Sequence, residues 1–320
     1  MRRSLLASLA AVACAGSSAR AQSYPTKPVK IIVPFPAGQS TDVLARVMAD
    51  QLTKAFGRQV IVENRPGAAG SIGADTAAKS APDGYTLLMV TISTHGISPA
   101  IYPKLPYDPQ KDFAPIANIA LTPQVLMASL KSGIASVPEL IAKAKAGGDL
   151  NFGTSGNGSA SHLAVEMLKS AAGIKLTHIP FKGNAEAQFA LQAGDIQLLS
   201  DAIPGAVGPI KAGKAKGLGI ADIRRSPFLP DLPTIAEQGV QGVVAVGWIG
   251  LSAPAGTPEP ILDRVSAEVM RILKEPEVLE KLRGLAFVPA KESRQEFKAY
   301  IALENIKWRK IAQDAGVKIE

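Results

Sequence analysis

The strongest constraint in this sequence is a short β-branched run that ends at two prolines and leads directly into a helical repeat. Residues 31–33 are typical of a buried strand, and Pro34 and Pro36 cannot donate hydrogen bonds to a neighbouring strand, so the strand is expected to end there. Apolar side chains then recur at helical spacing, and Ser40 or Thr41 is expected to cap the helix. A strand that turns straight into a helix is typical of an α/β fold.

The start of this predicted helix is a candidate anion site. The first N–H groups of a helix have no partner within it, and the helix dipole is positive at that end. A turn from Gly38 to Asp42 therefore favours a carboxylate or a phosphate. Asp42 itself has two candidate roles, one beside the ligand and one as a structural group that stabilises the helix start or pairs with Arg46.

The composition is that of a soluble protein with room for two domains. The chain has 320 residues, 47% of them apolar and 19% charged, so disorder is not expected. The formal net charge is +8, and because the first 21 residues hold three arginines and no acid, the remainder carries +5. The basic residues are not gathered into a stripe, so a nucleic-acid partner is not expected.

The N-terminus is expected to be a secretory signal peptide, residues 1–21. A basic start precedes an apolar stretch from Leu5 to Ala15, and small residues surround a cleavage position near Ala21. The apolar stretch is shorter than the ~20 residues that span a bilayer, which disfavours a membrane anchor. The alternative is a lipoprotein processed at Cys14, the only cysteine, but the usual leucine three residues before it is missing.

The remainder of the chain alternates predicted strands with predicted helices. This order favours mostly parallel sheets, whose ligand sites lie beyond the carboxyl ends of the strands. Several of those ends are followed by small polar residues, as in the loop 154–159, and a domain boundary is expected near Thr122. The strands that follow the first one are expected at residues 59–63, 85–90, 113–121, 150–153, 176–180, 196–200, 217–221 and 243–251.

A second predicted strand-to-helix turn carries three glycines, Gly67, Gly70 and Gly73. Their spacing matches neither the dinucleotide fingerprint nor a phosphate-binding loop, so no nucleotide cofactor is expected. The small residues would let a ligand approach the backbone amides, or would only let the helix pack closely. The sequence leaves both interpretations open.

Catalytic machinery is not recognisable in the sequence. The segment from Gly153 to Asn157 departs from a nucleophile elbow at its last position, and no histidine and acid can be assigned as its partners. Paired carboxylates for acid–base catalysis cannot be assigned either. His162 and Glu166 lie one helical turn apart, which suits two metal ligands, but no third ligand is evident, and neither a metal nor a cofactor is expected.

Six short motifs in order along the chain resemble the tripartite tricarboxylate transporter receptors, also called the Bug or TctC-like family. The resemblance extends from about Tyr24 to the C-terminus. Its weight comes from the order and spacing of the motifs, since no single one is decisive. They are Val33–Gly38 with Asp42, Asn64–Ala68 with Gly70, Pro82–Tyr85, Leu105–Asp108, Phe181–Gly183, and Leu232–Thr234 with Glu237 and Gly239.

This resemblance implies a fold and a function. The fold is α/β, a two-domain periplasmic-binding-protein-like fold of type II with mostly parallel sheets and two crossing strands as a hinge. Residues 22–121 and 248–320 would form the first domain and residues 122–247 the second. The implied protein is periplasmic and not an enzyme. It captures a small mono- or dicarboxylate between its domains and delivers it to inner-membrane permease subunits, and it is expected to be monomeric.

In such receptors, backbone amides and ordered water from loops after the strands hold the ligand carboxylate. This chain departs from the family pattern at Gln39, where glycine is common, and at Phe181, where tyrosine is common, so the solute of a relative cannot be transferred to it. The ligand-binding residues that the resemblance implies are Phe35, Pro36, Ala37, Gly38, Gln39, Asp42, Ala69, Gly70, Ser71, Thr91, Ser93, Thr154, Ser155, Gly156, Ser159, His162, Phe181, Lys182, Gly183, Ser200 and Asp201.

Some of these residues have structural alternatives. Lys182 also suits a solvated surface position, and each histidine suits a solvated or capping position. Trp248 is expected in core or hinge packing rather than in a ligand platform. For the whole protein, the alternatives to a transport receptor are a periplasmic sensor that feeds a signalling partner, or a hydrolase.

Overall fold

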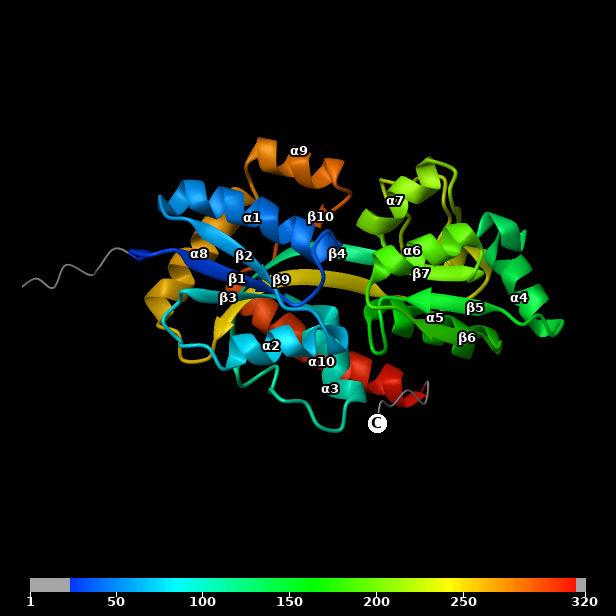
Figure 1. Cartoon of the computed structure of the whole chain (residues 1–320), viewed down its shortest axis with the longest axis horizontal. Coiled ribbons are helices and arrows are strands. Elements are labelled where there is room, and N and C mark those ends of the chain that lie inside the picture. Colours follow the sequence, from blue (N-terminus) through cyan, green and yellow to red (C-terminus); the bar gives the residue numbers. More distant parts are fainter. Residues whose placement is uncertain (1–23, 315–320) are drawn as a thin grey trace, which may run out of the picture.

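Strand β1, Val29–Val33, lies at the buried centre of one half of the molecule. The computed structural model in Figure 1 describes residues 24–314, so the predicted signal peptide and Cys14 lie outside the described residues. After β1 the chain passes Pro34 and Pro36 and enters helix α1, Ser40–Phe56. The helix ends at Gly57, whose φ of 62° is the left-handed conformation that stops many helices.

The half that contains β1 is called the first lobe here. Strand β1 pairs in parallel with β2 on one side and with β3 on the other. In Figure 1, α1 and α9 lie above this sheet and α2, α3 and α10 below it, so strands such as β3 are buried on both faces. The elements between α1 and the first crossing strand are β2 (Val60–Asn64), η1 (Ala68–Gly70), α2 (Ser71–Ala78), β3 (Thr86–Thr91), the π-helical turn η2 (Ile92–Ile97) and α3 (Ser98–Ile101).

Two long antiparallel strands, β4 (Phe113–Ala128) and β9 (Val246–Pro254), cross the middle of the molecule in Figure 1. They pair with each other from Phe113 opposite Pro254 to Pro123 opposite Val246. Strand β9 also pairs with β3 in the first lobe, and the far end of β4 pairs with β7 and β8 in the other half, called the second lobe here. The two strands therefore connect the lobes.

The second lobe repeats the α/β pattern. Strand β5 pairs in parallel with β6 and β7, and in Figure 1 α6 and α7 lie above these strands and α5 below them. Its elements are η3 (Leu130–Ser132), α4 (Val137–Lys145), β5 (Asn151–Thr154), α5 (Ala160–Ala172), β6 (Thr177–Pro180), α6 (Asn184–Ala193), β7 (Leu198–Ala202), α7 (Ile203–Lys211), β8 (Lys216–Ile220) and η4 (Ala236–Gln238).

After β9 the chain returns to the first lobe. Helix α8 packs against α1 and β4, and α10 packs against β4, α3 and η2. Strand β10 adds a short antiparallel pair to β4. These last elements are α8 (Glu259–Ile272), α9 (Pro276–Gly284), β10 (Val288–Pro289) and α10 (Arg294–Asp314).

The predicted α/β architecture with parallel strands in each lobe and two crossing strands is confirmed. Every antiparallel pair of the sheet involves β4 or β9. The strand predicted over residues 113–121 continues to Ala128, because its second half pairs with β7 and β8. The predicted cap on α1 is wrong, since Gln39 occupies the capping position and makes no side-chain hydrogen bond there. The domain boundaries, which fall inside β4 and β9, stay predictions.

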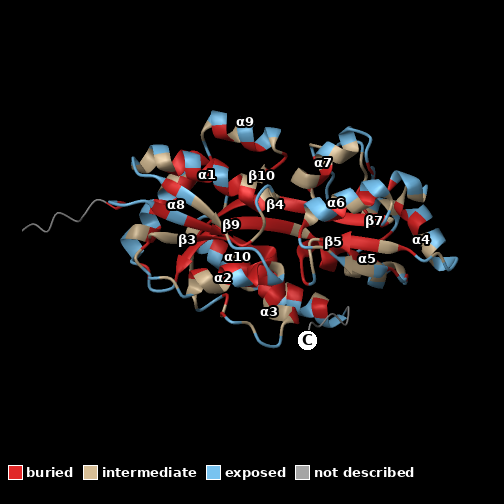
Figure 2. Ribbon diagram, in the orientation of Figure 1, coloured by how far each residue is buried: buried red, intermediate tan, exposed pale blue. Residues whose placement is uncertain are grey.

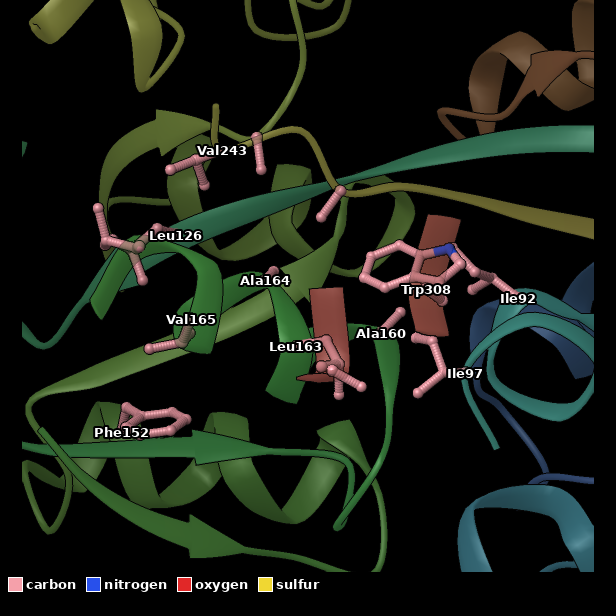
Figure 3. Close-up of a cluster of buried hydrophobic side chains, with 14 of the residues drawn as sticks. Ile92, Ile97, Leu126, Phe152, Ala160, Leu163, Ala164, Val165, Val243 and Trp308 are labelled. Carbon is pink, nitrogen blue, oxygen red and sulfur yellow. The ribbon is translucent and has the colours of Figure 1, made fainter. Parts of the chain in front are cut away.

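Burial is concentrated along β4 and β9 and on the helix faces that meet the sheet (Figure 2). One buried apolar cluster extends through both lobes. Figure 3 shows Trp308 of α10 beside Ile92 and Ile97 of the first lobe and Ala160 and Leu163 of α5, all members of this cluster. The lobes are therefore held together by apolar packing as well as by the crossing strands.

A buried glutamate ties β9 to the last helix. The indole N–H groups of Trp248 and Trp308 both donate to Oε2 of Glu304, at 3.2 and 2.8 Å, and both tryptophans are fully buried. Trp248 also packs its ring edge-on against Phe297. Core packing, as predicted for Trp248, thus fixes the crossing strand against α10.

We expect Glu304→Ala to lower the free energy of unfolding by about 2–4 kcal/mol, because it leaves two buried indole N–H groups without an acceptor. Urea unfolding followed by tryptophan fluorescence measures this change. Glu304→Gln, which keeps an acceptor oxygen, should lose less, and Glu280→Ala on the exposed face of α9 should lose little. Equal losses for the Ala and Gln variants at position 304 would contradict the shared-acceptor role.

Candidate functional site

A cavity of about 320 Å³ lies between the two lobes. The first lobe contributes the turn between β1 and α1 and the end of β3, and the second lobe contributes the starts of α5, α6 and α7. Its apolar lining includes Phe35, Val43, Ile92, Trp248, Ile249, Leu285 and Phe287. Its polar lining consists of Gln39, Ser40, Thr41, Thr91, Ser93, Thr122, Gln124, Ser155, Ser161, Asn184, Gln188 and Asp201.

The first turn of α1 faces this cavity. Gln39, Ser40 and Thr41 line it, and the Gln39 side chain does not cap the helix. The N–H groups of a first helical turn have no acceptor within the helix, and the dipole of this 17-residue helix is positive at that end. The predicted anion-binding helix start is therefore open towards the cavity.

Asp42 holds the turn in front of α1. Its Oδ2 accepts hydrogen bonds from the Gly38 amide at 2.8 Å and from Nε of Arg46 at 2.9 Å, and its Oδ1 accepts from Nδ2 of Asn64 at 2.9 Å. Burial raises the pKa of Asp42, but the hydrogen bonds from Arg46, Gly38 and Asn64 outweigh it, so the pKa lies below the ordinary 3.8. Both oxygens are occupied by protein donors, and this geometry favours the structural alternative.

Hydroxyl groups at the end of β3 meet the second lobe. Thr91 and Ser93 line the cavity, and Ser93 Oγ accepts a hydrogen bond from the backbone N–H of Ala160 at 3.3 Å. Ala160 is the first residue of α5, so this bond joins the two lobes at the cavity edge. It can form only when the lobes are close together.

A second contact between the lobes involves Gln39 and Gly183. A Cβ atom at Gly183 would overlap Nε2 of Gln39 and would lie 3.6 Å from Pro36. The absence of a side chain at Gly183 therefore allows the Gln39 amide to lie against the second lobe. Gln39, where this chain departs from the family pattern, therefore forms part of the surface at which the two lobes meet.

Serines at the start of α5 form one hydrogen-bonded group. Ser159 Oγ accepts from the His162 amide at 3.2 Å and lies 2.9 Å from Ser161 Oγ, which in turn accepts from the Ser155 amide at 3.2 Å. Ser155 and Ser161 line the cavity, whereas Ser159 caps the helix. The cap fixes the positions of its two neighbours.

Two stacked histidines hold the loop behind these serines. The rings of His162 and His178 lie 4.0 Å apart between centroids. His162 Nδ1 accepts from the Gly158 amide at 3.2 Å, and His178 Nε2 lies 2.6 Å from Thr154 Oγ1. Burial, with a further contribution from His162, lowers the pKa of His178 to about 3. His178 is therefore neutral at neutral pH, and both histidines hold backbone or hydroxyl groups of this loop.

Asp201 is the only ionisable side chain that lines the cavity, counting the residues between 24 and 314. It is 2% exposed and lies at the end of β7. Its carboxylate accepts from Nδ2 of Asn184, from Nε2 of Gln188 at 2.7 Å and from its neighbour's amide, that of Ala202, at 2.7 Å. Burial raises its pKa to about 7, against the opposing effect of these hydrogen bonds.

Comparison with known proteins decides the family. Residues 44–317 match the family described as the tripartite tricarboxylate transporter family receptor. This chain belongs to that family. The sequence-based recognition is therefore confirmed.

Three solved structures resemble this receptor closely. A protein from R. palustris with adipate is 34% identical, with a TM-score of 0.89 over 92% of this chain and 99% of that one. The periplasmic binding protein BugD is 32% identical, with a TM-score of 0.87 over 93% and 100%. MatC from Rhodopseudomonas palustris with bound malate is 33% identical, with a TM-score of 0.85 over 90% and 99%. The predicted periplasmic-binding-protein-like fold is thereby confirmed.

Seven of the residues predicted for ligand binding line the cavity of this receptor. The remaining candidates lie beside the cavity or away from it, and their role in binding stays a prediction. Those that line it are Phe35, Gly38, Gln39, Thr91, Ser93, Ser155 and Asp201. Those that do not are Pro36, Ala37, Asp42, Ala69, Gly70, Ser71, Thr154, Gly156, Ser159, His162, Phe181, Lys182, Gly183 and Ser200.

The turn between β2 and α2, which contains Gly67 and Gly70, and the start of α2, which contains Gly73, pack against other residues of the first lobe instead of lining the cavity. A Cβ atom at Gly70 would lie 2.7 Å from Thr94 Cγ2, and one at Gly73 would lie 2.8 Å from both the Arg65 carbonyl oxygen and Pro34 Cα. Each distance is shorter than a side-chain carbon tolerates. Close helix packing, the second interpretation of these glycines, is what the geometry supports.

Three other residues with predicted roles lie away from the cavity lining. Ser200 precedes Asp201 on β7, so its side chain points to the opposite face of the sheet, where it is buried. Lys182 is exposed and its amide donates to Glu186 at 3.1 Å, as the surface alternative predicts. The solvated position is wrong for His95, which is completely buried with Nδ1 2.9 Å from Thr94 Oγ1.

Sequence reasoning missed part of the lining. Thr122 and Gln124 lie on β4, and Asn184 and Gln188 lie on the first turns of α6. The Asn184 and Gln188 pair has a signal in the sequence, because polar residues four apart at a helix start share one face. Thr122 and Gln124 on β4 have no such signal in the sequence, because only the register of the strand places them at the cavity.

Neither a metal group nor a membrane span is present in the described part of the receptor. Between residues 24 and 314, no third histidine, cysteine, aspartate or glutamate joins His162 and Glu166 in a group that could hold a metal ion. No helix in the same range combines the length and the hydropathy needed to cross a membrane.

We expect Asp42→Ala to lower the free energy of unfolding by about 1–3 kcal/mol, because it removes the acceptor for Gly38, Arg46 and Asn64. Asp50→Ala, on the exposed face of the same helix, is the matched control and should change little. Urea titrations between pH 3 and 7 measure both. The pKa of Asp42 is lowered, so its contribution is present above about pH 4 and is lost below it. Equal effects of both variants would contradict the role of Asp42 in holding the turn before α1.

The contribution of Asp201 to stability should change with pH in the opposite direction to that of Asp42. Its pKa rises from 3.8 to about 7 on folding, so the folded state binds the extra proton between these values, and its favourable contribution is lost as the pH rises through that window. The difference corresponds to at most about 4 kcal/mol. Relative to Asp201→Asn, the unmodified receptor should therefore lose stability between pH 4 and pH 8 in urea titrations. Parallel pH profiles would show that Asp201 is ionised throughout.

Proposed function

We propose that this receptor is a periplasmic solute-binding protein that captures a small mono- or dicarboxylate in the cavity between its lobes and delivers it to a tripartite tricarboxylate-type permease. The observation that carries the proposal is the first turn of α1, which faces an interlobe cavity whose described lining contains no lysine, arginine or histidine. An anion in such a cavity is bound through amides, hydroxyls and the helix dipole.

Relatives support the choice of ligand class. A structure with adipate and a structure with malate share about a third of their residues with this chain and superpose over nearly its whole length. Both ligands are small carboxylates. The helix start in this chain offers the type of donor that a carboxylate needs, so the same class fits it.

The proposed mechanism is closure around the solute. In the open state the ligand carboxylate meets the Ser40 and Thr41 amides, and closure then adds the contacts of Ser93 with Ala160 and of Gln39 with Gly183. A ligand that touches both lobes shifts the population towards the closed state, because its full set of contacts exists only there. The closed form is what a permease would distinguish. No step of this cycle transforms the solute.

The first test is a thermal-shift panel of mono-, di- and tricarboxylates, aromatic acids, amino acids and neutral sugars. At a hundred times its dissociation constant a ligand adds ~2.7 kcal/mol, which raises the melting temperature measurably. We expect shifts with small carboxylates and unchanged ligand after incubation. Shifts with sugars alone, or product formation from a bound acid, would contradict the proposal.

The second test removes one backbone donor. Proline is tolerated at the first position of a helix, and Gln39 already has the extended conformation (φ −74°, ψ 161°) that a residue before proline adopts. Ser40→Pro should therefore keep the fold and weaken the binding of the best acid at least tenfold in calorimetry, whereas Ser40→Ala, which keeps the amide, should bind normally. Equal affinities of the two variants would exclude the Ser40 amide as a ligand donor.

A further inference from the structure

The cavity has two chemically different sides. Its first-lobe side presents the start of α1 with Ser40 and Thr41, where N–H donors and a positive dipole favour an anion. Its second-lobe side presents the Asp201 carboxylate at the end of β7. A solute that contacts both lobes meets N–H donors on the first lobe and a carboxylate on the second.

The structure positions Asp201 tightly. Nε2 of Gln188 donates both to Asp201 Oδ2 and to the Gly205 carbonyl oxygen, at 2.7 and 3.0 Å, which fixes the amide between α6 and α7. A side chain at Gly205 would overlap the carboxylate, so the absence of one there allows the acid to lie against the first turn of α7. Asp201 therefore has one defined position, with three N–H donors from Asn184, Gln188 and Ala202.

Within residues 24–314, no cationic side chain forms an ion pair with the Asp201 carboxylate. The hydrogen bonds to Asp201 come from neutral amides, and no lysine, arginine or histidine is among the cavity-lining residues of the described chain. A buried carboxylate without a counter-ion resists ionisation, and burial accordingly raises the pKa of Asp201 to about 7. An incoming cation or hydrogen-bond donor would compensate the charge, whereas a second anion would add to it.

We propose that Asp201 selects solutes that carry one carboxylate for the α1 start and, at the opposite end, a hydrogen-bond donor such as an ammonium or a hydroxyl group. This inference rests on the proposed function and narrows it from carboxylates in general to amino and hydroxy acids. An ammonium group would form a charge-assisted hydrogen bond with the Asp201 carboxylate, and a hydroxyl group would donate a hydrogen bond to it. A second carboxylate at that end meets a like charge in a low dielectric.

Two sets of acids of equal chain length test the proposal. The four-carbon set is butanoate, 4-aminobutanoate, 4-hydroxybutanoate and succinate, and the six-carbon set is hexanoate, 6-aminohexanoate, 6-hydroxyhexanoate and adipate. In calorimetry at pH 8, in at least one set, the amino or hydroxy acid should bind at least tenfold more tightly than both the unsubstituted acid and the dicarboxylate. Tightest binding of the dicarboxylate in the set that binds would overturn the proposal.

Variants separate the role of Asp201 from a general effect of charge. Asp201→Asn should remove the advantage of the amino acid over the unsubstituted acid, which lowers the ratio of their affinities tenfold or more. Asp195→Asn removes the same charge from an exposed position in the same lobe and should leave the ranking unchanged. An unchanged order of affinities in Asp201→Asn would overturn the proposal. If that variant does not unfold cooperatively, the order of affinities in the unmodified receptor decides.

The outcomes distinguish this inference from the proposed function. If other carboxylates shift the melting temperature but neither set shows a preference for a donor-bearing acid, the receptor function stands and the selection by Asp201 is wrong. If no carboxylate of any kind binds, the proposed function itself fails. A dicarboxylate that binds tightly below pH 7 and weakly above it would show that Asp201 shares a proton with the ligand, which also overturns the proposal.

Discussion

The antiparallel pairing of β4 with β9 is the constraint on which the rest of the structure depends. The two strands cross between the lobes, and their register fixes how the lobes face each other. Because β3 pairs with β9 and β7 pairs with β4, the carboxyl ends of β3 and β7 meet on opposite sides of one cavity. The shared acceptor Glu304 then ties β9 to the last helix through two tryptophans. Loops that are far apart in the sequence converge because these two strands position them.

The distribution of charge around the cavity gives the site its chemistry. On the first lobe, Arg46 and the Gly38 amide compensate the charge of Asp42. The start of α1 therefore presents neutral N–H donors and the positive end of the helix dipole. On the second lobe Asp201 has only neutral partners. In the proposed binding mode, Asp42 therefore builds the turn that receives the anion, and Asp201 meets a second group of the solute. Similar residues have different roles because their partners differ.

The parts of this structure that depend on local patterns could be predicted from the sequence. Prolines end β1, small polar residues follow β3 and β5, and the resemblance to the family supplied the crossing strands. What depends on long-range register could not: Gln124 looks like any strand residue until the pairing of β4 is known. Helix α7 was missed because Pro209 and two glycines interrupt its apolar repeat. The glycine turn before α2 left two interpretations, and only the packing of Gly73 against Pro34 distinguishes them.

The central claim is that the amide donors at the start of α1 hold the carboxylate of a solute enclosed between the lobes. A crystal structure of the receptor with the acid that gives the largest thermal shift tests this most directly. The account predicts a carboxylate oxygen about 2.7–3.2 Å from the backbone nitrogen of Ser40 or Thr41, with Ser93 bonded to Ala160 across the closed lobes. A carboxylate bound elsewhere, with the start of α1 covered by a protein side chain, would contradict it.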